Sequence, residues 1–139
     1  MANYDTYQDH TPITRSGGSN AASFPAVTTF ENTFDASRRN LAAGDTADVL
    51  QIPSGSLVQN VFVQVLNGES GQTMTVQDTA GTPNVYVDAA NVETTGTRLM
   101  GSGGDEFYED GTTLRVLVPS TMEYTTLKVR IVASVVCMG

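Results

Sequence analysis

The sequence predicts an all-β fold: an antiparallel β-sandwich, jelly-roll-like, with an extended N-terminal arm. Short runs of β-branched and aromatic residues alternate with polar residues, which is the period of two expected of half-buried strands. Clusters of Gly, Pro, Asn, Asp and Ser separate these runs at intervals of roughly ten residues, and no run has the period of an amphipathic helix. The 139 residues suffice for one domain.

Residues 1–23 are predicted to form an arm outside the folded body, which comprises residues 24–139. The arm has few apolar side chains and no regular period, and Gly17–Asn20 has the composition of a linker. Such a segment buries too little surface to offset its ordering entropy, about 1–2 kcal/mol per residue for the backbone. Either the arm reaches a neighbouring subunit or it is a mobile tail, and the sequence supports both. The anchors of a reaching arm would be Tyr4, Tyr7 and Ile13.

The body begins with a predicted strand over residues 24–34. Phe30 and Phe34 share one parity, while Glu31 lies on the other, as expected of a half-buried strand. Pro25 cannot donate a ladder hydrogen bond, so this strand is expected at an edge or to start near the proline.

Two strong β-rich runs follow, residues 49–52 and 57–66, around the turn-forming Pro53-Ser54-Gly55-Ser56. In the second run, valines 61, 63 and 65 share one face, and Phe62 and Leu66 point to the other. Because both faces are apolar, this strand is predicted to lie centrally and to be covered on both sides.

The middle of the chain is predicted to form shorter strands around Met74–Val76 and Val85–Val87. Turns are expected at residues 67–71 and 80–83, which are rich in Gly, Asn and Pro. Residues 89–96 are ambiguous, because one helical turn or a loop fits them equally well.

The last two strands, residues 114–118 and 127–137, are predicted to pair as a hairpin connected by Pro119–Tyr124. The final strand carries an apolar side chain at every second position from Leu127 to Cys137. Cys137 is the only cysteine, so no intrachain disulfide is expected, and its phase predicts a small buried hydrophobe.

The charge of the chain argues against nucleic-acid and membrane partners. Fifteen acidic and seven basic residues give a formal net charge of −8, whereas phosphate binding needs clustered Lys and Arg. The only adjacent basic pair is Arg38-Arg39. The first residues lack the charged and apolar regions of a signal peptide, and no apolar run approaches about 18 residues, so neither secretion by a signal peptide nor a membrane span is expected.

The residue types needed for catalysis or for a tight metal site are scarce. The only histidine, His10, lies in the predicted arm, so a hydrolase triad has no base, and zinc lacks converging ligands. No cofactor, metal or catalytic residue is therefore predicted, and the protein is not expected to be an enzyme.

One carboxylate cluster, residues 105–110 (DEFYED), leaves two alternatives open. Four acids in six residues could bind Ca²⁺, but EF-hand spacing is absent. A solvated acidic loop, or an edge strand charged against edge-to-edge pairing, is the favoured interpretation.

The run DVLQIPSGSLVQNVFVQV, the Gly- and Thr-rich short strands after it, and the closing LKVRIVASVV resemble the small all-β head decoration (cement) proteins of tailed bacteriophages. The resemblance covers roughly residues 45–136. It implies a structural virion protein on the capsid exterior that stabilises contacts between capsid subunits. It also implies the major capsid protein as partner, a homo-oligomer, with a trimer favoured, and synthesis in the host bacterial cytoplasm.

Exposed aromatic side chains are favoured anchors at interfaces, so the predicted contact residues are Tyr4, Tyr7 and Ile13 of the arm and Phe107 and Tyr108 of the acidic segment. The alternative function is a carbohydrate- or receptor-binding β-sandwich module of a phage head or tail fibre. That alternative calls for an aromatic platform, and the chain has no Trp and only five Tyr.

Overall fold

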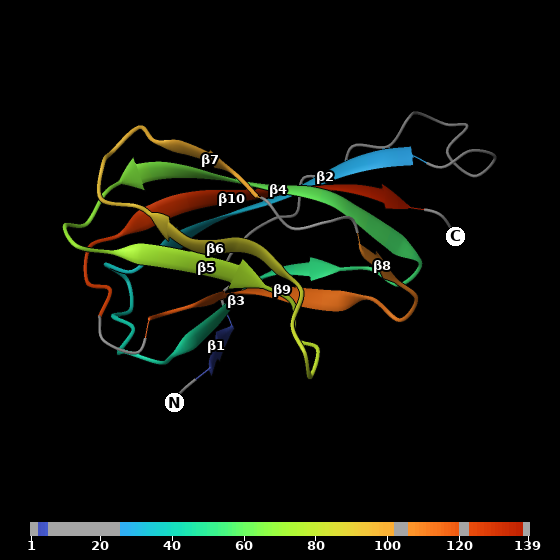
Figure 1. The fold of residues 1–139 in the computed structure, drawn as a ribbon, viewed down its shortest axis with the longest axis horizontal. Helices are drawn as coiled ribbons and strands as arrows, with labels where there is room; N and C mark the ends of the chain where they lie inside the picture. The colour runs from blue at the N-terminus through green and yellow to red at the C-terminus, as the bar shows by residue number, and fades with distance from the viewer. Residues whose placement is uncertain (1–2, 6–25, 102–105, 120–122, 138–139) are drawn as a thin grey trace.

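A computed structural model describes residues 3–5, 26–101, 106–119 and 123–137 (Figure 1). Regular structure in these ranges consists of β-strands alone, so the all-β prediction is confirmed. The strands are β1 (Asn3–Asp5), β2 (Ala26–Asp35), β3 (Thr46–Ile52), β4 (Ser56–Asn67), β5 (Thr73–Gln77), β6 (Val85–Asn91), β7 (Arg98–Met100), β8 (Glu106–Tyr108), β9 (Thr112–Leu117) and β10 (Lys128–Cys137).

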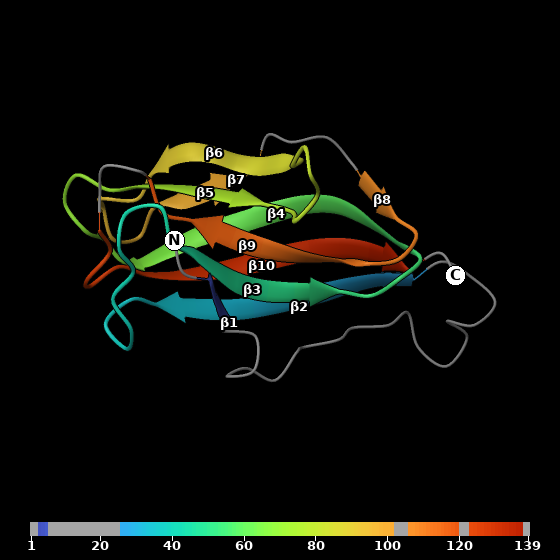
Figure 2. The ribbon, with the colours of Figure 1, turned by 90° about the horizontal axis from the view of Figure 1, so that it is seen from below.

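The strands form two sheets that pack face to face, as the two views in Figures 1 and 2 show. Sheet A has the order β1-β3-β9-β5-β6, and sheet B has the order β2-β10-β4-β7, with β8 also paired to β4. Every pairing is antiparallel except the parallel pair β1–β3. Without β1 and β8, two four-stranded sheets remain in the strand order of a jelly roll, which confirms the predicted architecture.

The core lies between the two sheets and follows the predicted alternation. In β10, which lies between β2 and β4, the inward side chains of Val129, Ile131, Ala133 and Val135 are buried. Phe34 of β2 meets Tyr124 edge to face, with ring centroids 6.1 Å apart. The aliphatic stripes of both sheets therefore supply most of the buried apolar area, with a few aromatic rings between them.

The predicted hairpin of the last two strands is wrong. Strand β9 lies between β3 and β5 in sheet A, whereas β10 lies between β2 and β4 in sheet B. Each strand carries an apolar stripe on one face, so the two stripes can pack across the core from opposite sheets. This arrangement buries both stripes and leaves each strand free to pair with partners from distant parts of the chain.

The prediction that both faces of β4 are covered is also wrong. Val61, Val63 and Val65 are buried, as expected. Phe62 and Leu66, on the opposite face, are each 36% exposed. Strand β4 is interior to its sheet, with β10 along one edge and β7 and β8 along the other. The sandwich, however, has only two layers, so the second face of sheet B has no layer packed on it in the single chain.

The loops follow the predicted turns. The loop after β4 begins at Gly68, and residues 80–83 lie in the loop between β5 and β6. Residues 89–91 continue β6 and only residues 92–96 form a loop, so the prediction of a helical turn or a loop over residues 89–96 is wrong for the first three residues. Near the other terminus, the backbone of Tyr4 in β1 lies beside Ala47 of β3. The division into an arm and a domain stays a prediction.

Two loops that cross between the sheets are joined by the carboxylate of Glu69. Its Oε1 accepts hydrogen bonds from the backbone amides of Thr125, Thr126 and Leu127 at 2.7–2.9 Å. Burial acts to raise the pKa of Glu69, but the three amides outweigh it and hold the pKa below 4.5. The carboxylate thus holds the loop between β9 and β10 to the loop that follows β4.

Candidate apolar docking face

The outer face of sheet B carries two rows of apolar side chains that run across its strands. Side chains paired in a ladder project to the same face, so the registers define each row. The row near the start of β4 comprises Val27, Val136, Leu57 and Phe107. The second row comprises Val132, Phe62 and Met100, and it ends on β2 at the charged Glu31. The most exposed members are Met100 at 67%, Val27 at 55% and Phe107 at 49%.

A β-bulge places these two rows on one face. The register of β4 against β10 shifts between Ser134 and Val135, which leaves Gln59 as an extra residue in β4. The bulge reverses the alternation of side chains along the strand. Leu57 and Phe62, which have opposite parity in the sequence, therefore project to the same side.

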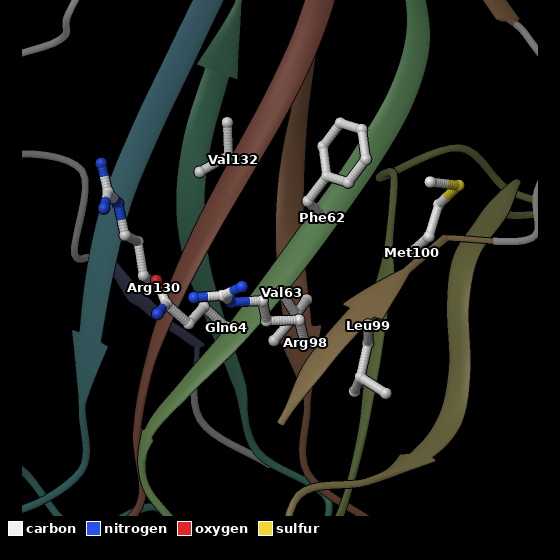
Figure 3. Close-up of a pocket in the computed structure, with 8 residues that line it drawn as sticks. All are labelled: Phe62, Val63, Gln64, Arg98, Leu99, Met100, Arg130 and Val132. Carbon is white, nitrogen blue, oxygen red and sulfur yellow. The ribbon is translucent and has the colours of Figure 1, made fainter. Parts of the chain in front are cut away.

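A shallow groove of about 330 Å³ opens beside the second row (Figure 3). Its lining residues are Phe62, Val63, Gln64, Arg98, Leu99, Met100, Arg130 and Val132. The groove thus has an apolar floor with cationic groups at its rim. This arrangement suits a partner surface on which an apolar side chain lies close to an acidic one.

The two arginines of the groove differ in their partners. Arg130 pairs with Glu31 of β2 at 2.5 Å. Arg98 makes no ion pair with the part of the chain that the structure describes, and Figure 3 shows its side chain extended from β7 toward β4. Arg98 therefore supplies an exposed positive charge at the groove of a strongly acidic protein.

The outer face of sheet A is different in character. The ladder aligns Asp48, Arg115 and Gln77 across three strands, and Arg115 pairs with Asp48 at 3.2 Å. The next row is formed by Thr46, Leu117 and Thr75. This face is mostly polar and carries an internal ion pair, so sheet B presents the more apolar surface of the two.

Strand β8 is fixed by a polar network beneath it. The hydroxyl of Tyr108 donates to Oδ2 of Asp78 at 2.8 Å and shares a 2.6 Å hydrogen bond with the hydroxyl of Tyr86. Burial and these two hydrogen bonds raise the pKa of Tyr108 well above its usual value, so the phenol stays protonated. Because side chains alternate along a strand, an inward Tyr108 places Phe107 on the outer face.

The structure describes three of the five predicted contact residues. Phe107 is exposed on the outer face, whereas Tyr108 is half-buried and its hydroxyl is already engaged. Tyr4 lies in β1. Tyr7 and Ile13 lie outside the described residues. The interface role of all five residues stays a prediction.

Within the acidic segment, Glu106–Tyr108 form strand β8 at an edge of β4, and Glu109 and Asp110 lie in the following turn, which agrees with the favoured interpretation for the described part of the segment. Glu106, Glu109 and Asp110 are exposed. No three His, Cys, Asp or Glu side chains converge as metal ligands among the residues that could be placed. No helix in these ranges is long and apolar enough to cross a membrane. Cys137 is half-buried, with its sulfur 3.7 Å from the Thr28 hydroxyl.

No protein-family model matches the sequence, and no curated protein matches it. Solved structures do match the fold. They show that this chain shares its jelly-roll sandwich with chains found in phage capsid structures. A chain of the cyanophage Pam1 capsid asymmetric unit is 19% identical with a TM-score of 0.64, covering 81% of this chain and 85% of that chain.

Two further neighbours come from phage capsids. A chain from the capsid of Ralstonia phage GP4 is 13% identical with a TM-score of 0.59, covering 100% of this chain and 97% of that chain. A chain from the acidic stable capsid structure of Helicobacter pylori bacteriophage KHP30 is 14% identical with a TM-score of 0.52, covering 81% and 89%. At these identities the likeness establishes a common fold.

Proposed function

We propose that this protein is a non-catalytic structural component of a bacteriophage virion. It binds the outside of the capsid and stabilises contacts between capsid subunits. The observation that carries the proposal is the fold likeness over most of the chain to three proteins found in phage capsid structures. The resemblance of residues 45–136 to decoration proteins favours the same role.

The mechanism is the addition of buried surface across boundaries between capsid subunits. A standard protein interface buries about 1,200–2,000 Å². Many copies act on one shell, so a modest affinity for each contact is enough to hold the expanded capsid against the pressure of its packaged DNA. Its partner is the major capsid protein.

The acidic character of the chain fits an exterior position. Phosphates of the packaged genome lie inside the shell, so an outer protein has no need of a basic surface. The formal charge of −8 would oppose direct contact with DNA.

We assign capsid contacts to the arm and leave the sandwich to hold the protein's shape. Tyr4, Tyr7 and Ile13 are the anchors, because large apolar side chains dominate binding energy at interfaces. Residues 6–25 join β1 to β2, and a connection of that length held at both ends reaches up to roughly 35 Å from the body, which allows contact with a neighbouring subunit.

The experiment is co-sedimentation of the purified full-length protein with undecorated, expanded capsids. Binding at micromolar concentration is expected, with protection of the capsids against heat. The Tyr7→Ser/Ile13→Ser variant should bind at least about tenfold more weakly, while Gln51→Glu, an exposed change on sheet A, should bind normally. Failure of the unaltered protein to co-sediment with the capsids would contradict the proposed function.

A further inference from the structure

We propose that the outer face of sheet B docks a second copy of this chain, with Phe107 of each copy seated at the Phe62 and Met100 groove of the other. This inference rests on the proposed virion function, for which the resemblance implies a homo-oligomer, and it names the surface through which two copies associate. A two-fold contact yields a dimer, in place of the trimer that the resemblance implies.

The first argument is the symmetry of the two apolar rows. On β10, Val136 and Val132 belong to different rows and each lies two residues from Ser134. Ser134 pairs with Thr29 and Asn60, so a polar row runs midway between the apolar ones. The apolar rows are therefore about 13 Å apart along the strand, on either side of a common centre line.

The second argument concerns the edge of the sheet. Strand β10 occupies one edge of β4 over its whole length, so β7 and β8 share the other edge. Figure 1 shows them at opposite ends of β4. Met100 and Phe107 therefore lie at the same side of the face, one in each row.

These placements make the face self-complementary about a two-fold axis along the polar row. That axis lays each apolar row on the other row of the second copy, and every contact occurs twice. The apolar pairs are Phe107 with Met100, Leu57 with Phe62, and Val136 with Val132. On β2 the same axis sets Val27 over Glu31, whose carboxylate is already paired with Arg130. Two apolar rows per copy are thereby removed from water.

The third argument is charge. Glu109 follows β8 in the turn to β9, at the end of the face beyond Phe107, and Arg98 lies two residues from Met100 at the opposite end. The same axis therefore brings the turn that carries Glu109 of one copy to the end of the face where Arg98 of the other copy lies. A two-fold axis along the strands would instead place Arg98 over Thr33, so the charges favour the axis along the polar row.

The area is sufficient for a specific dimer. Four strands at about 4.8 Å and ten residues of β10 at about 3.4 Å give a face of about 19 by 34 Å. The two copies together bury about 1,300 Å², within the range of about 1,200–2,000 Å² for stable interfaces. Sheets also pack well face to face at about 10 Å.

The test is native mass spectrometry and sedimentation equilibrium of the full-length protein from about 1 to 100 µM, the range in which a modest dimer dissociates. A dimer is expected. Phe62→Glu and Phe107→Glu should each raise its dissociation constant at least about 30-fold. Gln51→Glu on sheet A is the matched control and should leave it unchanged, and thermal melting verifies that each variant is folded.

The charge pair provides a rescue experiment. Arg98→Glu and Glu109→Arg should each weaken the dimer about tenfold, and the double variant should regain most of the loss. A monomer at the highest concentration, a trimer, or failure of the double variant to recover would overturn the two-fold contact. Capsid co-sedimentation is measured separately. A monomeric Phe62→Glu protein that still binds capsids would support this face as the contact between two copies, and an unaltered dimer that fails to bind capsids would contradict the proposed virion function alone.

Discussion

The hydroxyl of Tyr108 donates a 2.8 Å hydrogen bond to Asp78, a residue 30 positions earlier in the chain. Asp78 is only 2% exposed, and its other carboxylate oxygen accepts the amides of Ala80 and Asn84 at 3.1 Å. The buried carboxylate thus relies on protein donors in place of water. The bond that turns Tyr108 inward also holds Phe107 outward, so an interior network positions an exposed aromatic ring.

Tyr108→Phe should lower the free energy of unfolding by about 1–3 kcal/mol, because Oδ2 of Asp78 loses its donor inside the protein. Urea denaturation followed by circular dichroism measures the change. Thr79→Ala, next to Asp78 but exposed, is the control and should stay within about 0.5 kcal/mol of the parent. Equal stability of Tyr108→Phe and the parent would show that the network does not hold β8.

Gly111→Ala should destabilise the turn between β8 and β9. Gly111 has a φ of +77°, and an added Cβ would lie 2.6 Å from the carbonyl oxygen of Ile52. A loss of about 1–3 kcal/mol in unfolding free energy is expected. Gly81→Ala is the matched control, because nothing lies within 4 Å of its added Cβ. Similar midpoints for the two variants would contradict the described turn.

Glu69→Gln tests the pH dependence of the crossover loops. The pKa of Glu69 is held below 4.5 in the folded protein, so its stabilising effect is fully present above that pH and is lost as the pH falls through the lowered folded value. The melting temperature of the variant should therefore lie below that of the parent at pH 7.

The gap in melting temperature between Glu69→Gln and the parent should narrow as the pH drops from about 4.5 toward 3. Differential scanning calorimetry across that range measures it, with Asp88→Asn as an exposed control. A gap that stays constant with pH would show that the charge on Glu69 does not hold the amides of residues 125–127.

Ile131→Ala and Val132→Ala separate the two faces of β10. Ile131 is fully buried between the sheets, while its neighbour Val132 is half-buried on the outer face. The first change should cost about 2–5 kcal/mol, because it leaves a cavity in the core. The second change should lower the unfolding free energy of the monomer much less. Equal losses of unfolding free energy in denaturant titrations would contradict the assignment of Ile131 to the inner face and Val132 to the outer face.

The sequence predicted the strands well because their signal is local. The alternation of apolar and polar residues in β2, β4 and β10 depends only on neighbours in the chain, and side chains must alternate in any strand. Pairing is a different matter. The proximity of β9 and β10 in sequence suggested a hairpin, yet their stripes pack across the core from different sheets.

The docking face was partly visible in the sequence. Phe107 was predicted as a contact residue, and Phe62 was correctly placed opposite the buried valines. Met100 and Val132 were missed, because they join Phe62 only through the ladder register. The sequence did carry a signal for this face, because apolar side chains occur at both odd and even positions of β4. That pattern was interpreted as a strand covered on both faces.

By itself, the sequence determined an acidic, all-β protein with apolar stripes in known strands, since composition and period are properties of the chain alone. Only the tertiary structure decided which strands pair and where the bulge at Gln59 falls. It also decided that one apolar face of sheet B stays open. Those outcomes depend on contacts between residues far apart in the chain, and a two-layer sandwich covers just one face of each sheet.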